Sequence, residues 1–190
     1  FETYQYVENI INIEGSYFAT GIIVGDESEG TILKDNIINA KASVTYGITL
    51  EMSQESIIDN NTVELESEVV YGIQGYQSNE NEITSNVFNA NAKYVYVIVL
   101  SNGNYNKILY NSINANGLGG NLTIKNLDSL GYGNAGIYLH ADSCNNTISG
   151  NEIISSKGYA ILMDEGAIGN IILDNYLSLI AIFLFHQVKL

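Results

Sequence analysis

Ser101, His140 and Asp164 are the residues whose types could supply a nucleophile, a base and an orienting acid. They occur in the chain order of a Ser/His/Asp triad, in which the serine attacks and the histidine takes its proton. Each residue directly follows a short apolar segment of one recurring pattern, so a repeating fold would stack the three about 5 Å apart. They are the catalytic candidates, although no oxyanion hole can be read from the sequence.

The same region supplies the candidate binding residues. Tyrosine and histidine rings can contact sugars, and two acids about 5–10 Å apart could act on a glycosidic bond. The alternative is that the tyrosines pack in turns and the acids form a solvated face. The candidates for binding are Tyr76, Tyr138, His140, Asp142 and Asp164.

A six-residue motif must position these side chains. It consists of an apolar residue, two variable residues, Asn, one variable residue and a second apolar residue, as in Ile58-x-x-Asn61-x-Val63. Steps between successive Asn residues are 27, 25, 25, 25, 40 and 24 residues, and a fixed period of this size marks a solenoid. The Asn column comprises Asn9, Asn36, Asn61, Asn86, Asn111, Asn151 and Asn175.

A second column, a small residue followed by Ile, keeps register with the first. Examples are Gly47-Ile48, Gly136-Ile137 and Ala160-Ile161. The alternating Ile, Val, Tyr and Thr residues around both columns indicate short β-strands, with room for three in each unit. The sequence therefore predicts an all-β, single-stranded right-handed parallel β-helix of about seven turns of about 25 residues.

The Asn column has a structural explanation. A sharp bend between strands leaves backbone groups unpaired, and an Asn side chain can bond them and tolerates left-handed backbone angles. Amides stacked once per turn can also bond each other, as in the Asn ladders of cross-β stacks. We therefore expect no chemistry from this column.

The two repeats resemble the parallel β-helix repeats of the pectate-lyase-like superfamily over about residues 6–184. In its Asn, Ile and Tyr content the chain is most similar to archaeal and bacterial adhesin-like surface proteins, and copper-site maturation proteins of the periplasm share the repeat. Enzymes of this superfamily use an Arg or Lys base, an Asp cluster with Gly-His-Gly, or Asp-Pro-His. This chain has neither Arg nor Pro and lacks the Gly-His-Gly and Asp-Pro-His motifs, which favours a non-catalytic protein over an enzyme.

The charge balance excludes several partners. A net charge of −14 argues against nucleic acid and an anionic membrane surface, since both attract basic proteins. The lone Cys144 allows no internal disulfide and no zinc-type spacing, so no metal site is predicted. Acidic clusters around residues 26–29, 64–68 and 80–82 favour a solvated face, with weak Ca²⁺ binding as the alternative.

The repeat fails at two places. Residues 114–133 form an insertion, which we expect to be a loop packed on the rod or a binding lid. The last segment, residues 177–185, leaves too little chain for a third strand, so we expect it to depart from the coil or cap it. We expect residues 1–190 to be a single β-helix domain and a segment of a longer repeat protein.

Three functions remain open from the sequence. The first is a non-catalytic, extracellular adhesin-like segment that contacts glycans or surface proteins. The second is a carbohydrate-active enzyme with a groove near His140. The third is a self-assembling element, because a cut β-helix exposes unpaired strand edges and can associate end to end.

Overall fold

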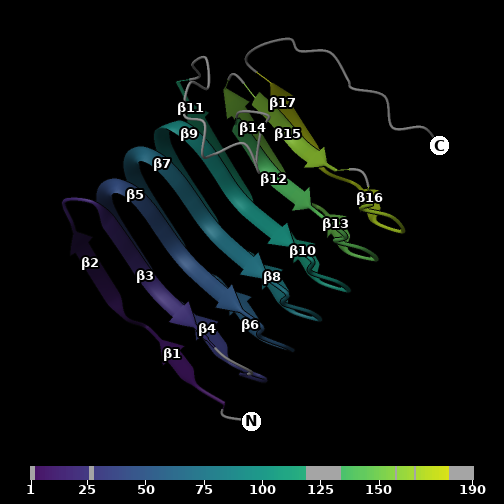
Figure 1. Cartoon of the computed structure of the whole chain (residues 1–190), viewed down its shortest axis with the longest axis horizontal. Helices are drawn as coiled ribbons and strands as arrows, with labels where there is room; N and C mark the ends of the chain where they lie inside the picture. The colour runs from purple at the N-terminus through teal and green to yellow at the C-terminus, as the bar shows by residue number, and fades with distance from the viewer. Residues whose placement is uncertain (1–2, 26–27, 119–133, 157, 165, 180–190) are drawn as a thin grey trace.

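The computed structural model describes residues 3–25, 28–118, 134–156, 158–164 and 166–179. It is an all-β parallel solenoid, and no helix occurs in these ranges. The strands stack side by side along the longest axis of the molecule, from β1 and β2 at one end to β16 and β17 at the other (Figure 1). Among the described residues, no helix has the length and hydrophobicity needed to cross a bilayer.

One sheet consists of seven short strands, one from each level of the rod, and all its pairs are parallel. In spatial order these strands are β1 (Gln5–Val7), β4 (Ile32–Lys34), β6 (Ile57–Asp59), β8 (Glu82–Thr84), β10 (Lys107–Leu109), β13 (Thr147–Ser149) and β16 (Ile171–Leu173).

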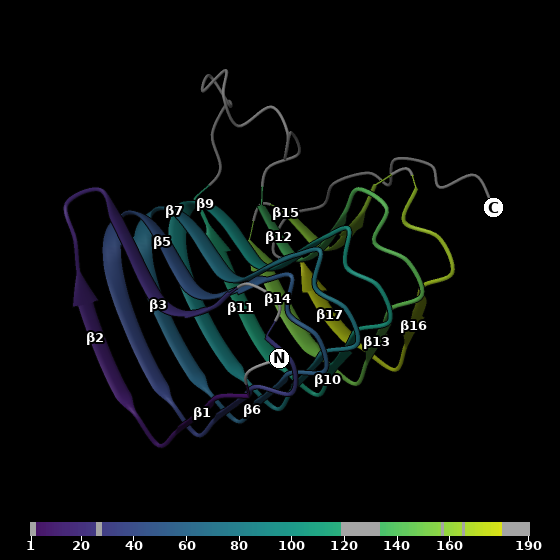
Figure 2. The same ribbon diagram turned by 60° about the horizontal axis from the view of Figure 1, so that its bottom comes forward.

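The second sheet is built from longer strands and faces the first across the core (Figure 2). Its strands are β2 (Ile10–Glu14), β3 (Phe18–Val24), β5 (Ile37–Glu51), β7 (Thr62–Tyr76), β9 (Val87–Ser101), β11 (Ser112–Gly117), β12 (Asn134–His140), β14 (Glu152–Ser156), β15 (Gly158–Met163) and β17 (Tyr176–Leu179).

The structure corrects one expectation about the turn. Three separate strands were expected, but β5, β7 and β9 each run for 15 residues and merge two of them. Their pairing skips only Ser43 and Gly47 and the equivalent positions on neighbouring turns, so these bends are too mild to end the strand. In the described ranges the short-strand sheet has seven levels, separated by six complete turns, which agrees with the expected coil of about 25 residues per turn.

The core is a set of inward columns with one residue per turn. Leu33, Ile58, Ile83, Ile108 and Ile148 lie above one another in register and are fully buried. Burying each aliphatic side chain contributes roughly 1.5–3 kcal/mol before entropy is subtracted. A Cβ on Gly47 would lie 2.5 Å from Gly72 O and 2.7 Å from Val63 Cγ1, which explains the small residue before the inward Ile.

The Asn column forms a continuous ladder. The Oδ1 atom of Asn86 accepts two hydrogen bonds of 2.9 Å, from the backbone N–H and from Nδ2 of Asn61. Its own Nδ2 donates to Ile58 O at 2.8 Å and to the next rung, Asn111, at 3.0 Å. The pattern repeats from Asn9 to Asn175, so the structural role predicted for this column is confirmed.

Left-handed backbone angles lie beside the ladder rather than on it. The residue directly before each rung has positive φ, at Glu8, Asp35, Asn60, Ser85, Tyr110, Gly150 and Asp174. The bend turns the following N–H groups away from ordinary strand pairing, and the amide oxygen of the neighbouring rung accepts them.

A second ladder was missed by the sequence reasoning. Asn81, Asn106, Asn146 and Asn170 repeat the same double donation, and Ser56 N–H donates to Asn81 at the start. Each of these four Asn residues stands five positions before a rung of the first ladder, as in Asn81 and Asn86. That fixed Asn-x4-Asn spacing is the signal that could have revealed it.

The two irregular segments lie mostly outside the described residues. Residues 114–117 of the expected insertion belong to strand β11, whereas residues 119–133 are not described. Likewise Tyr176–Leu179 is strand β17, so the start of the expected cap continues the coil, and residues 180–190 are not described.

We expect Asn86→Ala to lower the free energy of unfolding by about 3 kcal/mol, because it leaves the Asn61 N–H and Ile58 O without partners inside the rod. Asn9→Ala removes only the side-chain donation to Asn36 at the exposed first rung and should cost about 1 kcal/mol or less. Urea denaturation followed by circular dichroism compares the two. An equal loss of unfolding free energy in both variants would contradict the view that the buried rungs of the ladder stabilise the fold.

Candidate functional site

The candidate cluster lies at the carboxyl ends of β12 and β15. Asp164 follows Met163, the partner of Leu139, and therefore lies beside His140 on the next turn. His140 Nδ1 is 2.5 Å from Asp164 Oδ2, and Tyr138 OH is 2.9 and 2.8 Å from the two carboxylate oxygens. Tyr138 OH also lies 3.1 Å from His140 Nδ1.

The carboxylate fixes the roles of its neighbours. An ionised Asp164 can only accept, so the Tyr138 hydroxyl and the His140 Nδ1–H both donate to it. That tautomer leaves His140 Nε2 as a hydrogen-bond acceptor or base. The His140 and Asp164 side chains are 25% and 20% exposed, so the pair is within reach of solvent.

Register also brings Tyr76 and Ser101 to this edge. Tyr76 pairs with Ser101, and Ser101 pairs with His140, so all three follow one line across the turns, as the sequence predicted. The described residues contain no hydrogen bond between Ser101 and His140. Asp142 is exposed and lies beside Gly166, and the structure shows no bond from it to His140 or Asp164 in the described part of the chain.

Tyr138 is not an exposed contact, which corrects the sequence expectation. Its side chain is only 1% exposed and packs in a second apolar cluster outside the main core. Ala135 stands in register with Tyr96, and its small side chain leaves room for the Tyr138 ring to stack on Tyr96 at 6.1 Å. Tyr76, half exposed, remains on the surface.

A column of stacked rings leads to this cluster. Tyr46, Tyr71 and Tyr96 occupy one register position on successive turns, with ring centroids 5.0 and 5.7 Å apart. Burial raises the pKa of the Tyr46 and Tyr71 hydroxyls, and the neighbouring tyrosines add to the shift at Tyr71. The column is a packing element, and its last ring, Tyr96, orients the Tyr138 ring by stacking on it.

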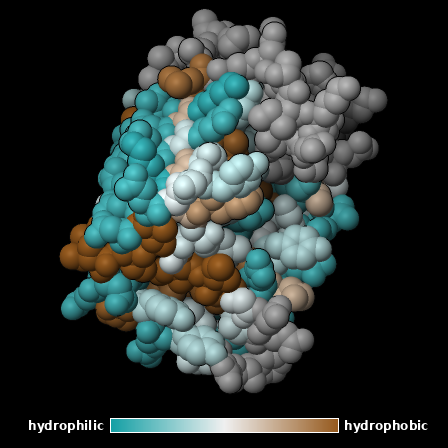
Figure 3. Space-filling view, turned by 60° about the vertical axis from the view of Figure 1, so that its left-hand side comes forward, coloured by the Kyte–Doolittle hydropathy of each residue, from teal (hydrophilic) through white to brown (hydrophobic). Residues whose placement is uncertain are grey.

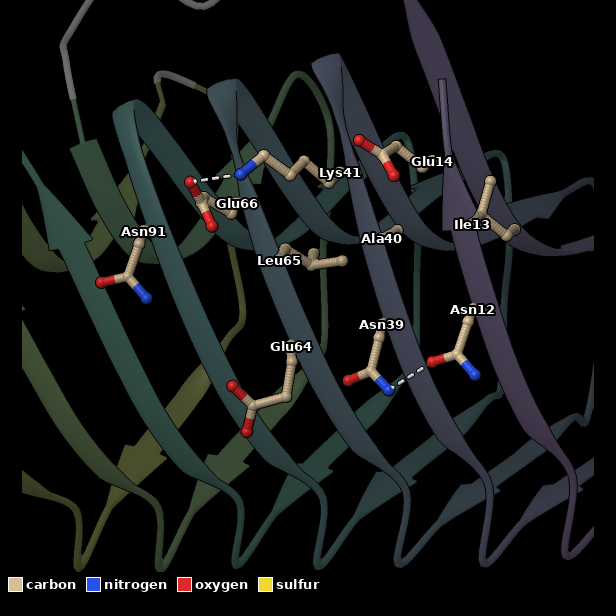
Figure 4. Close-up of a pocket in the computed structure, with 10 residues that line it drawn as sticks. All are labelled: Asn12, Ile13, Glu14, Asn39, Ala40, Lys41, Glu64, Leu65, Glu66 and Asn91. Atoms are coloured by element: carbon tan, nitrogen blue, oxygen red, sulfur yellow. Dashed lines mark hydrogen bonds and ion pairs between the residues drawn. The ribbon is translucent and has the colours of Figure 1, made fainter. Parts of the chain in front are cut away.

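A separate groove runs over the outer face of β2, β5, β7 and β9. It encloses about 540 Å³ between two columns of polar side chains (Figure 4). Its lining residues are Asn12, Ile13, Glu14, Asn39, Ala40, Lys41, Glu64, Leu65, Glu66 and Asn91. Sequence reasoning missed this groove, although the outward Asn and Glu residues recur at the repeat period.

Cross-turn bonds hold the groove side chains in fixed rows. Asn39 Nδ2 donates to Asn12 Oδ1 at 2.8 Å, and Lys41 Nζ donates to Glu66 at 2.9 Å. Asn89, next to the groove, donates to Glu64 at 2.7 Å. Because the lining has three carboxylates and one ammonium, the groove offers amide and carboxylate groups and has a negative field.

The family follows from comparison with known sequences. The model described as "Periplasmic copper-binding protein (NosD)" matches residues 4–119, which is more than half of the chain. This chain belongs to the NosD family. No curated protein matches this NosD-family chain.

Two solved structures share the fold of this NosD-family chain. The periplasmic alginate epimerase AlgG is 17% identical with a TM-score of 0.62, over 94% of this chain and 43% of that one. A double mutant of AlgG is 15% identical with a TM-score of 0.59, over 91% and 44%. The chain thus spans less than half the length of these structures, and at this identity the likeness concerns the fold alone.

Within the described ranges the side chains do not form a copper site, although the family description names copper. Copper favours imidazole, thiolate and thioether ligands. His140 keeps Nε2 as the ring nitrogen that could bind a metal, since Nδ1 is bonded to Asp164, and Cys144 Sγ is bonded to Gly166 O at 3.1 Å. Across the described ranges, no three His, Cys, Asp or Glu side chains gather as a metal would require, and His186 lies outside them.

The raised pKa of Tyr71 predicts alkaline instability. The pKa of Tyr71 is higher in the folded chain than its unfolded value of about 10. The stability contributed by its buried, neutral hydroxyl is therefore complete below pH 10 and is lost as the pH rises through the folded pKa. We expect the urea midpoint to fall steeply above about pH 10 and Tyr71→Phe to reduce that fall. Tyr17→Phe, at an exposed ring, is the matched control. An equal effect of both variants would contradict the assignment.

Proposed function

We propose that the chain is a non-catalytic, adhesin-like module that works outside the cytoplasm and binds glycans along the groove of Figure 4. The observation that carries this proposal is the pair of polar columns, in which the Asn39–Asn12 bond and the Lys41–Glu66 bond each link neighbouring turns within one column. They offer fixed donors and acceptors over four strands, and a hydroxyl-rich polymer could bond along them. The periplasmic descriptions of the NosD family and of AlgG support a location outside the cytoplasm.

The charge of the groove selects among glycans. Glu14, Glu64 and Glu66 outnumber Lys41, and the whole chain carries −14, so a polyuronate would be repelled. Neutral glycans and glycans with amino groups carry no such penalty. The ligand class we propose therefore differs from the alginate that AlgG's description names.

The binding test compares glycan classes on the intact chain. In affinity electrophoresis we expect retardation by a neutral β-glucan or a glucosamine polymer, and none by alginate or pectin without divalent cations. Asn39→Ala should weaken binding about fivefold, because it removes one hydrogen bond of about 1 kcal/mol. Asn60→Ser is the matched control: Asn60 is an exposed Asn outside the groove lining, and the next turn has Ser85 at that position. Binding that is unchanged in Asn39→Ala would refute the groove.

A second candidate function is favoured by one observation. Asp164 holds His140 in the tautomer whose Nε2 is an acceptor, which is what a general base requires. A carbohydrate-active enzyme could use that nitrogen, with Ser101 and Tyr76 along the same line. Incubation with neutral glycans, alginate and pectin tests this enzyme function. Turnover that His140→Ala abolishes would replace the non-catalytic proposal. The absence of turnover on all of these glycans would support the non-catalytic proposal.

A further inference from the structure

One polar row of the groove is a chain of hydrogen bonds with a single break. This outer row occupies one register position on the outer face of β2, β5, β7, β9 and β11, and its members are Asn12, Asn39, Glu64, Asn89 and Asn114. Asn39 donates to Asn12 at 2.8 Å, and Asn89 donates to Glu64 at 2.7 Å. Asn114 donates to Asn89 at 3.5 Å. In the described ranges the remaining step, from Glu64 to Asn39, has no such bond.

The break exists because Glu64 has no N–H to give. An ionised carboxylate only accepts, and Glu64 Oε1 already accepts from Asn89. Asn39 uses its Nδ2 on Asn12, and its Oδ1 is turned toward the strand of Glu64 (Figure 4). Two acceptors therefore stand on neighbouring strands about 4.8 Å apart, and no side chain of the described structure donates between them. A donor that makes bonds of about 2.8 Å to both would bridge them.

The charge at this step is not balanced either. Lys41, which lines the groove, is 2.9 Å from Glu66 and so pairs within the other polar row. Glu64 makes no ion pair in the part of the chain that the structure describes. A cationic donor at the break would gain a bond to each acceptor and a charge opposite to that of Glu64.

The surroundings of the break fit a sugar rather than a bare amine. Ile10, Ile37 and Val87 are exposed and stand two residues before the outer row on their strands, so an apolar column borders the polar one. Figure 3, which brings the start of the rod forward, shows hydrophobic side chains gathered beside hydrophilic ones. A pyranose ring has apolar C–H faces and polar hydroxyl edges, so it can contact both columns at once.

We propose that the groove binds a glycan that carries primary amines, with one protonated amine seated between Asn39 Oδ1 and the Glu64 carboxylate. The proposal rests on the glycan-binding function proposed above and names the class of sugar that the groove prefers. An ammonium has three N–H donors, so it can bond both acceptors. A hydroxyl or an acetylated amine has one donor and no charge, so it can bond only one of them.

The test compares tetrasaccharides of the same β-1,4 linkage on the intact chain. The ligands are the glucosamine tetramer, the N-acetylglucosamine tetramer and cellotetraose, at about pH 6, below the ordinary pKa of a primary amine. By isothermal titration calorimetry we expect the glucosamine tetramer to bind about tenfold more tightly than the other two, because charge-assisted bonds are roughly twice as strong as neutral ones. Raising the salt concentration from about 20 to about 500 mM should remove most of this preference, since salt screens the ion pair but not the neutral contacts.

Glu64→Gln is the variant that addresses the break directly. A Gln side chain removes the charge and supplies an N–H that can donate to Asn39, so the tenfold preference for the glucosamine tetramer should disappear. Glu152→Gln is the matched control, because Glu152 lies outward on β14 of the same sheet but outside the groove lining. This control should keep the preference. Circular dichroism verifies that both variants keep the strand content, and the salt series on the unaltered chain tests the ion pair without any variant.

The outcomes separate the amine site from the glycan groove. Equal binding of the three tetrasaccharides would overturn the amine site and leave the glycan groove standing, whereas no binding of any of them would overturn both. A preference that Glu64→Gln leaves unchanged would overturn the seat between Asn39 and Glu64. Tetralysine that bound as tightly as the glucosamine tetramer would overturn the choice of a glycan as the carrier of the amine.

Discussion

The structure depends on one amide oxygen that accepts two donors across each bend. A residue with positive φ opens the backbone before every rung, and the following N–H groups cannot enter an ordinary strand ladder. The Asn of the neighbouring turn accepts them, at 2.8–3.0 Å along the first ladder. This bond fixes the register of successive turns, and that register stacks the aliphatic columns, the tyrosine rings and the outer rows of the groove.

Much of this architecture could be predicted because the repeat is regular. The Asn period identifies the solenoid, and the line of Tyr76, Ser101 and His140 follows from register alone. Burial of Tyr138 could not be predicted in this way, because it depends on Ala135 replacing the tyrosine of the earlier turns. Merging of two strands into β5 depends on how sharply Ser43 and Gly47 bend the chain, which residue types alone do not determine.

The two candidate sites differ in what the fold provides. At the edge of β12 and β15, Asp164 accepts from the buried Tyr138 hydroxyl and from His140 Nδ1, so Nε2 is the nitrogen of this ring that can meet an external group. The groove instead repeats the same polar groups from turn to turn over four strands. A repeated surface suits a repeated ligand, whereas a single cluster suits one reacting atom. NosD-family membership is compatible with either, because one fold can carry many different sites.

The ladder is indifferent to the length of chain between its rungs. The step from Asn111 to Asn151 spans 40 residues, yet its bonds of 2.9 and 3.0 Å match those of the 25-residue steps. Closing a longer loop adds little entropy cost once both ends are held. Segments of different length can therefore stand between Gly117 and Asn134 without a change in the packing of the core. At such a position a repeat protein can acquire a new segment while the ladder and the core that stabilise the coil stay the same.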